Sequence, residues 1–260
     1  MRHSNTFIVS FAAAVCLVCS VFVATSAVGL RSRQEVNRVL DRQKKVLTVA
    51  GLIEEGEQIE AQRVQELFEQ NIQAKVIELT SGEPDPDVDP ASFDQQKAQK
   101  DPARSREAPP NPAGIRRVPN DALVYLVKPE GEVEKIILPI EGKGLWSTLY
   151  GYLALAPDTT TIEGIIFYEH GETPGLGAEV DNPSWKALWE GRQAYDEDWE
   201  PAITVIKGHA GSPAEDPHKV DGLSGATITA RGVSDLVRFW LGENGFAPYL
   251  ERFRSERSAA

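Results

Sequence analysis

The segment of this chain best suited to chemistry is DGLSGATIT, which runs from Asp221 to Thr229. It presents the hydroxyl groups of Ser224 and Thr227 on either side of a flexible Gly-Ala pair, and an amphipathic pattern typical of a helix follows it. One interpretation is an ordinary helix start that Ser224 or Thr227 caps. The other is a phosphate site, because such a turn exposes backbone N–H groups at the positive end of a helix. On the residues alone, the plain cap is favoured.

A second loop of small residues, EHGETPGLG, follows an apolar segment and ends at Gly177. Gly175 and Gly177 would let the backbone approach a ligand closely, and Glu172 and Thr173 offer polar groups beside them. The alternative interpretation is a wide surface loop with no ligand.

A third loop, GKGLWS, spans residues 142–147 and places Trp146 between small residues. An indole at a loop edge can cover the hydrophobic core or stack on a flat aromatic ligand. A tryptophan side chain more often covers the core than binds a ligand.

Several classes of function are excluded by what the chain lacks. The 27 Lys and Arg residues against 39 Asp and Glu give a net charge of −12, which disfavours nucleic-acid binding. Both cysteines, Cys16 and Cys19, lie in the first twenty residues, so the rest of the chain has no thiol nucleophile or thiolate metal ligand. We expect His170 to be exposed and no metal site to form. No residue pattern indicates a catalytic site of a hydrolase or transferase.

The elements that must position these loops can be read from the hydrophobic pattern. Apolar runs at 122–127 and 135–140, joined by a Pro-Glu-Gly turn, predict a β-hairpin. The remaining predicted strands lie at 75–80, 148–155, 161–169 and 202–207. The predicted helices lie at 58–72, 183–190 and 228–241. Strands interleaved with a few helices favour a compact α+β fold.

The amino-terminal segment 7–30 contains no charged residue and is long enough, at about 1.5 Å per residue, to cross a membrane as one helix. A cleaved secretory signal is the alternative, although its apolar region is usually shorter. The basic residues that follow, such as Arg31 and Lys44, would by the positive-inside rule keep the large domain in the cytoplasm.

The predicted organisation therefore has five parts. Residues 1–6 form a short tail, 7–30 a transmembrane helix, and 31–80 a helical stalk with a first strand. Residues 81–120 hold eight of the 17 prolines, which predicts a linker or surface excursion without a helix or a central strand. Residues 121–260 form the α+β domain.

Taken together, the three loops resemble the FMN-binding domain family. SGAT at 224–227, after Asp221 and Gly222, looks like its flavin-attachment signature, and ETPGLG at 172–177 and GKGLWS at 142–147 resemble its other two loops. The membrane helix and the long segment before the domain extend the resemblance to the C subunits of bacterial Na⁺-translocating NADH:quinone reductases.

The resemblance implies that a flavin transferase joins FMN covalently to the hydroxyl of Thr227 through a phosphodiester, with Thr229 at most in a supporting role. The other residues that it places around the cofactor are Asp221, Ser224, Gly225, Ala226, Trp146, Ser147, Glu172, Thr173, Gly175, Leu176 and Gly177.

The resemblance also implies a role. The chain would relay electrons through its FMN inside a membrane complex that oxidises NADH, reduces ubiquinone and exports Na⁺. It would have no independent active site, and its partners would be the other subunits. The family places this domain outside the bacterial inner membrane, which disagrees with the charge rule, and we follow the more specific motifs.

Two alternatives remain open at this stage. The chain could be the homologous flavin subunit of an Rnf-type electron transport complex, which shares the SGAT signature. It could also be a membrane-tethered module without a redox role that binds a phosphorylated ligand reversibly.

Overall fold

The computed structural model describes residues 5–258 and divides the chain into two compact units, one that ends at Gln43 and one that begins at Lys44. The predicted tail over residues 1–6 falls largely outside the described residues, and Asn5 already belongs to a helix.

The first helix, α1, runs without a break from Asn5 to Ala50. Its part Asn5–Arg31, with a mean hydropathy of 2.7, is long and apolar enough to cross a membrane. The last residues of α1 belong to the second unit, where Val46, Leu47 and Ala50 are buried. Because apolar residues continue at helical spacing to Ala50, the predicted membrane helix and the start of the stalk form one element.

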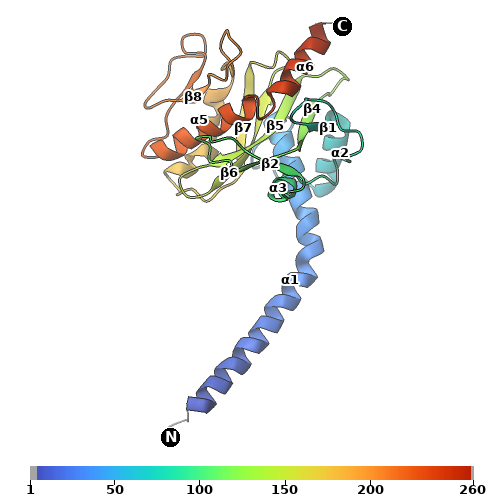
Figure 1. Cartoon of the computed structure of the whole chain (residues 1–260), viewed down its shortest axis with the longest axis vertical. Helices are drawn as coiled ribbons and strands as arrows, with labels where there is room; N and C mark the ends of the chain where they lie inside the picture. The colour runs from blue at the N-terminus through green and yellow to red at the C-terminus, as the bar shows by residue number, and fades with distance from the viewer. Residues whose placement is uncertain (1–4, 259–260) are drawn as a thin grey trace. The chain divides into compact units, whose positions relative to one another are not determined.

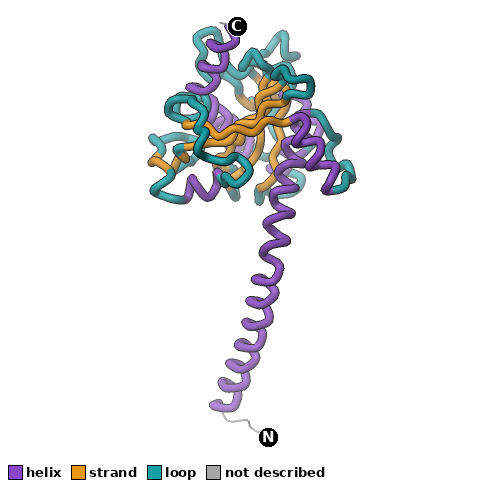
Figure 2. Tube along the Cα trace, turned by 90° about the vertical axis from the view of Figure 1, so that its right-hand side faces the viewer, coloured by secondary structure: helices purple, strands orange, loops and turns teal. Residues whose placement is uncertain are grey.

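An antiparallel sheet of five strands is the centre of the second unit, with the order β1-β4-β5-β6-β7 (Figures 1 and 2). The strands are β1 (Ile72–Glu78), β4 (Asp121–Val127), β5 (Lys135–Lys143), β6 (Thr148–Leu155) and β7 (Ile162–Glu169). The predicted hairpin is confirmed, with Tyr125 opposite Ile137. The strand predicted at 202–207 is only β8 (Thr204–Val205), which pairs in parallel with β9 (Lys219–Val220) in a separate small sheet.

Both faces of the main sheet are covered. On one face lies α5 (Thr227–Leu241) (Figure 1). Its Leu236 and Trp240 side chains are fully buried, and the Trp240 indole donates a 2.7 Å hydrogen bond to the carbonyl oxygen of Glu141. On the other face, Phe68 of α2 (Ala61–Asn71) packs edge-on against Tyr125. The apolar runs of the central strands supply both cores, because successive side chains of a strand point to opposite faces of the sheet.

Four further helical elements belong to this unit. The helix predicted at 183–190 is split into α4 (Pro183–Lys186) and a 3₁₀ turn, η2 (Ala187–Trp189). Another 3₁₀ turn, η1 (Gly177–Asp181), lies just before α4. The carboxy-terminal helix α6 (Ala247–Ser258) was not predicted, since its pattern is barely amphipathic.

The proline-rich segment 81–120 is folded onto the domain. It contains α3 (Gln95–Lys100), β2 (Ser105–Glu107) and β3 (Arg117–Pro119), so the prediction that it could not sustain a helix was wrong. This six-residue helix fits between prolines, and the Asp94 carboxylate caps it by accepting a 3.1 Å bond from the Lys97 amide. Phe93, Ala113 and Val118 are buried and anchor the segment.

Close packing of α5 on the end of β5 generates a testable prediction. A Cβ atom at Gly232 would lie 2.3 Å from the carbonyl oxygen of Lys143. Gly232→Ala should therefore lower the free energy of unfolding by about 2 kcal/mol, measured by urea denaturation, although alanine is the better helix former.

Gly164→Ala is the matched control, because its Cβ would meet Val49 Cγ2 at an ordinary 3.6 Å. We expect its stability to stay within about 1 kcal/mol of the parent chain. If Gly232→Ala instead raised the free energy of unfolding, the prediction would be wrong, and α5 would be able to move away from β5 without loss of stability.

Candidate functional site

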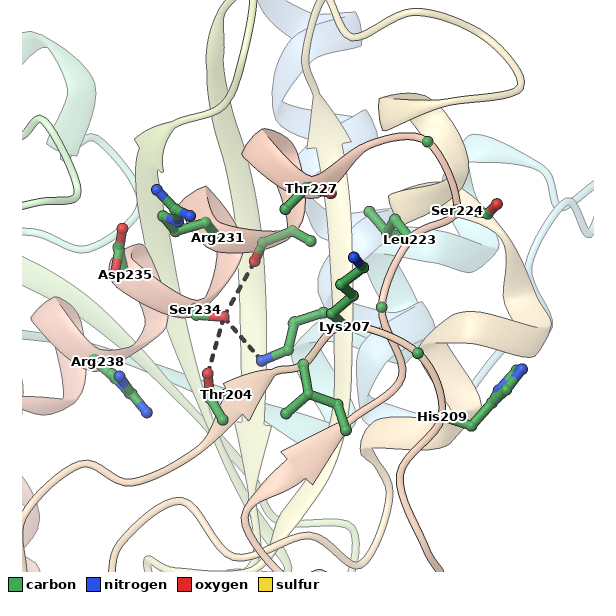
Figure 3. Close-up of a pocket in the computed structure, with 16 residues that line it drawn as sticks. Thr204, Lys207, His209, Leu223, Ser224, Thr227, Arg231, Ser234, Asp235 and Arg238 are labelled. Carbon is green, nitrogen blue, oxygen red and sulfur yellow. Dashed lines mark hydrogen bonds between the residues drawn. The ribbon is translucent and has the colours of Figure 1, made fainter.

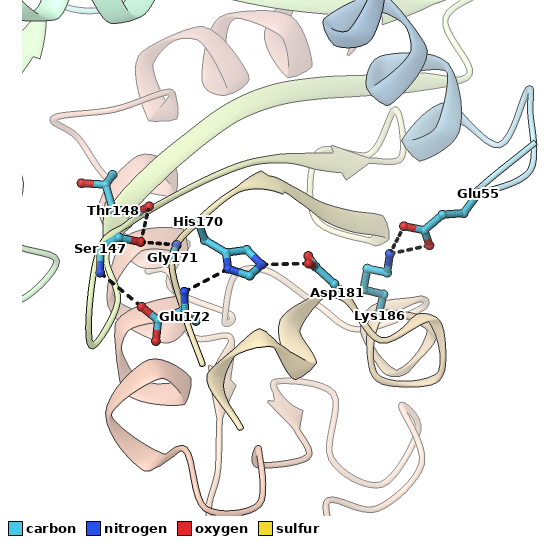
Figure 4. Close-up of polar contacts among 8 residues, drawn as sticks. All are labelled: Glu55, Ser147, Thr148, His170, Gly171, Glu172, Asp181 and Lys186. Atoms are coloured by element: carbon cyan, nitrogen blue, oxygen red, sulfur yellow. Dashed lines mark hydrogen bonds and ion pairs between the residues drawn. The ribbon is translucent and has the colours of Figure 1, made fainter. Parts of the chain in front are cut away.

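One buried carboxylate, that of Glu172, joins the three loops. Figure 4 shows its hydrogen bond with Ser147. Its Oε1 accepts hydrogen bonds from the backbone amides of Trp146 at 2.9 Å and Ser147 at 3.3 Å. Its Oε2 accepts bonds from the Leu145 amide at 3.3 Å and from the Thr229 hydroxyl at 2.6 Å. The four hydrogen bonds of this carboxylate thus all link parts of the protein, and its role beside a ligand stays a prediction.

Two glycines make room for this carboxylate. A Cβ atom at Gly144 would lie 2.6 Å from Glu172 Oε1, and one at Gly177 would lie 2.6 Å from Oε2. The close approach that we predicted at Gly177 is therefore an approach to Glu172. Gly175 is different: its φ of +74° requires glycine, but a Cβ atom there would meet no atom within 4 Å.

The hydrogen bonds also determine the charge of the site. Burial favours the neutral form of Glu172, but the bonds from Thr229 and from the amides of residues 145–147 outweigh it and lower the pKa of this carboxyl. Glu172 is therefore ionised at neutral pH. Thr229 is fully buried with its hydroxyl donated to Glu172, so its oxygen is not open to modification.

Thr227 lies in a different environment. It is exposed and is the first residue of α5, so the unpaired N–H groups of the first turn are beside it. Ala226 is the N-cap residue and makes no side-chain cap bond. The plain-cap interpretation, with Ser224 or Thr227 as the cap, was therefore wrong. Gly225, with a φ of +70°, turns the chain so that Thr227 faces outward.

Asp221 anchors this turn. Its carboxylate accepts a bond from the Ala210 amide at 2.9 Å and pairs with the His209 ring at 2.6 Å. Its carbonyl oxygen accepts a 2.9 Å bond from the Trp185 indole. Asp221 therefore fixes the segment that leads to Thr227.

A pocket of about 620 Å³ opens beside the turn (Figure 3). Ser224, Gly225 and Thr227 line one side of it, and the cationic side chains of Lys207 and Arg231 contribute to its wall. These two cations were not predicted as site residues. Lys207 follows a strand and Arg231 lies in a helix, and an isolated basic residue in such a position does not indicate a ligand site.

The three loops also expose an unusual amount of apolar surface. Outside α1, the large hydrophobic side chains exposed among residues 5–258 are Leu145, Trp146, Leu176, Trp199 and Ile228, and all but Trp199 belong to these loops. Trp146 is 70% exposed, so it does not cover the core. Exposed apolar clusters in a folded domain mark binding surfaces. Leu145 and Ile228 were not predicted as site residues, because leucine and isoleucine are common throughout the chain.

The other predicted residues support the loops. The Ser147 hydroxyl accepts a 2.6 Å bond from the Gly171 amide, and the Thr173 carbonyl accepts bonds from the amides of Leu176 and Ala178, each at 3.1 Å. His170 was predicted to be exposed, but its side chain is only 10% exposed and pairs with Asp181 (Figure 4).

Comparison with known proteins agrees with this geometry. The family model of the FMN-binding domain matches residues 144–242, which include Trp146, Glu172 and Thr227. The fold and the site thus define a protein with an FMN-binding domain.

Relatives narrow the assignment. The C subunit of the Na⁺-translocating NADH-quinone reductase of Pseudomonas aeruginosa is 48% identical over 97% of both chains. Its counterpart from Yersinia pestis is 47% identical over 92% of this chain and 90% of the relative. The crystal structure of Shewanella oneidensis NqrC superposes with a TM-score of 0.77 at 36% identity, over 84% of this chain and 99% of that one.

The chain belongs to the family of Na⁺-translocating NADH-quinone reductase C subunits. It is thus a subunit of an oxidoreductase complex, and the α+β domain after one long apolar helix agrees with that of the solved relative.

The contacts of Glu172 predict a specific destabilisation. Glu172→Gln replaces an acceptor oxygen by an NH₂ group that faces amide and hydroxyl donors. We expect the free energy of unfolding at pH 7 to fall by about 2–3 kcal/mol in denaturant titrations. Because the pKa of Glu172 is lowered in the folded state, this stabilisation is present above the unfolded pKa and is lost as the pH falls through the folded pKa.

The exposed neighbour Glu169 provides the control. Glu169→Gln should leave stability within about 0.5 kcal/mol of the parent at every pH. If Glu172→Gln behaved like Glu169→Gln, the carboxylate would not be what holds the loops together.

Proposed function

We propose that FMN is attached covalently to Thr227, through a phosphodiester between the FMN phosphate and Oγ1, and that the chain relays electrons within a Na⁺-translocating NADH:ubiquinone reductase. The attachment adds FMN less one water to the chain. When bound, FMN supplies the capacity to accept and release electrons one at a time.

The contrast between two neighbouring hydroxyls carries this proposal. Thr229 is buried and bonded to Glu172, whereas Thr227 is exposed at the start of α5 and lines the pocket of about 620 Å³. The first-turn amides of α5 favour the negative charge that a phosphodiester keeps. The pocket lining adds three cations and one carboxylate, namely Lys207, Arg231, Arg238 and Asp235.

The apolar surface of the loops suits the flavin ring. Trp146, Leu176 and Ile228 present flat or branched apolar groups to solvent around the turn that holds Thr227. The hypothetical Cβ of Gly225 would lie 2.9 Å from Leu176 Cδ2, which brings the second loop against the attachment turn. An isoalloxazine ring over these side chains would remove them from water and keep one edge open to a partner.

The remaining parts of the proposal concern place and partners. A flavin transferase makes the bond during maturation, and the apolar part of α1 holds the chain in the bacterial inner membrane with its domain on the periplasmic side. Other subunits of the complex supply the NADH site and exchange electrons with the flavin. A covalent bond keeps the cofactor on a site that is open to them.

The test is expression with the flavin transferase, followed by intact mass, peptide mapping and flavin fluorescence in a denaturing gel. Thr227→Val should lose all covalent flavin, because it removes the only atom that bonds to phosphorus, while circular dichroism and the thermal midpoint stay close to those of the parent.

Ser224→Ala and Thr229→Val are the controls, and both should keep the flavin. Thr229→Val should also lower the thermal midpoint, since it removes a hydrogen-bond donor to buried Glu172. Flavin that remains on Thr227→Val, or flavin that leaves the parent chain on unfolding, would contradict the covalent assignment and favour a reversible binder.

A further inference from the structure

A second pocket, of about 600 Å³, is lined by residues of the GKGLWS loop and of the proline-rich segment. Trp146, Ser147 and Thr148 line one part of it. Four cationic side chains also line it, and we refer to them as the basic patch: Lys100, Arg116, Arg117 and Lys143.

The basic patch is assembled from three separate elements. Lys100 ends α3, Arg117 begins β3 and Lys143 ends β5. Arg117 is fixed, because its guanidinium donates bonds to the Ser105 hydroxyl at 2.8 Å and to the Ser105 carbonyl at 2.6 Å. A surface that several elements build in one place is preorganised for contact.

A tight turn holds the proline-rich segment against β5. The Asn111 side chain bonds the backbone of Ile115 in both directions, at 2.8 and 3.1 Å, and Gly114 lies between them with a φ of +68°. The Lys143 amide donates a 2.8 Å bond to the Ala113 carbonyl. Gly114 has no side chain to displace the stem of Lys143, whose Cβ lies 2.9 Å from where a Cβ of residue 114 would be.

The basic patch has little charge compensation of its own. Among residues 5–258, no ion pair involves Lys100, Arg116 or Lys143, and all three are exposed. Glu141 is the one carboxylate in the pocket lining, and burial raises its pKa to about 7, against weaker opposing effects of Gln99 and Lys100. This concentration of positive charge stands out in a chain with a net charge of −12.

The flavin-binding region does not account for the basic patch. The FMN-binding family model begins at residue 144, so all four cations lie before the matched region, and of the four only Lys143 belongs to the GKGLWS loop. The Pseudomonas aeruginosa relative aligns over 97% of the chain, so the aligned region includes the proline-rich segment. Trp146 belongs to both surfaces, because it lies in the flavin loop and lines this pocket.

We propose that the basic patch, with Trp146 at its edge, docks an acidic surface of a neighbouring protein subunit and so brings an electron-exchange partner beside the flavin. The position of the flavin in this statement rests on the function proposed above. Exposed lysines hold a small anion weakly because water competes, whereas a docked protein surface excludes that water. Tryptophan and arginine are the residue types that contribute most at protein interfaces.

Zero-length cross-linking of the intact reductase complex tests the docking. A carbodiimide joins a lysine amine to a carboxylate only where the two are in contact. We expect peptide mapping to find Lys100 and Lys143 joined to Asp or Glu residues of another subunit, and 1 M salt during the reaction to reduce these products at least fivefold. The proposal is wrong if neither lysine joins another subunit.

A charge-reversal pair gives an independent readout. Lys100→Glu/Lys143→Glu should slow the reduction of the covalent flavin by NADH in the complex at least fivefold. Lys128→Glu/Arg257→Glu makes the same charge change away from both pockets and should stay within twofold of the parent. Equal rates in the two pairs would overturn the proposal.

Flavin fluorescence in a denaturing gel separates the two proposals. Both pairs should carry as much flavin as the parent, because no residue of the basic patch holds the attachment turn. A parent chain without covalent flavin would contradict the proposed function, and the cross-links would still decide the docking.

Discussion

The hydrogen bonds to the Glu172 carboxylate are the interaction on which the rest of the site depends. Its oxygens accept from three consecutive amides of one loop and from Thr229 in α5, although the loops are distant in sequence. A buried carboxylate is unfavourable unless such donors surround it, so Glu172 and its partners must fold together. Gly144 and Gly177 follow from the same constraint, because any side chain there would occupy the space of the carboxylate.

The contacts of Glu172 also explain which of the two threonine hydroxyls, that of Thr227 or that of Thr229, is open to solvent. Residues two apart in the first turn of a helix point in different directions. Once Thr229 points inward to Glu172, Thr227 faces solvent beside the first-turn amides. The different exposure of the two threonines therefore depends on a contact with a residue 57 positions away in the chain, and not on the turn at 221–227 alone.

The sequence predicted those parts of the molecule that depend on local pattern. Two apolar runs joined by a Pro-Glu-Gly turn predicted the hairpin of β4 and β5, and the 3.6-residue period predicted α5 to within one residue of its start. It could not predict that Glu172 turns inward, because only long-range donors stabilise its charge there. It also missed the fold of residues 81–120, where a few anchors such as Phe93 and Val118 override the effect of the prolines.

The exposed apolar loops and the proposed covalent attachment follow from one requirement. A cofactor that exchanges electrons with another subunit must keep an edge open, so it cannot lie in a deep pocket that would hold it by burial alone. Trp146, Leu176 and Ile228 offer a surface that a flat ring can cover on one side only. Contact on one side buries less area and binds more weakly than enclosure. The bond that we propose to Thr227 would remove dissociation altogether, and the fold would then need only to orient the ring.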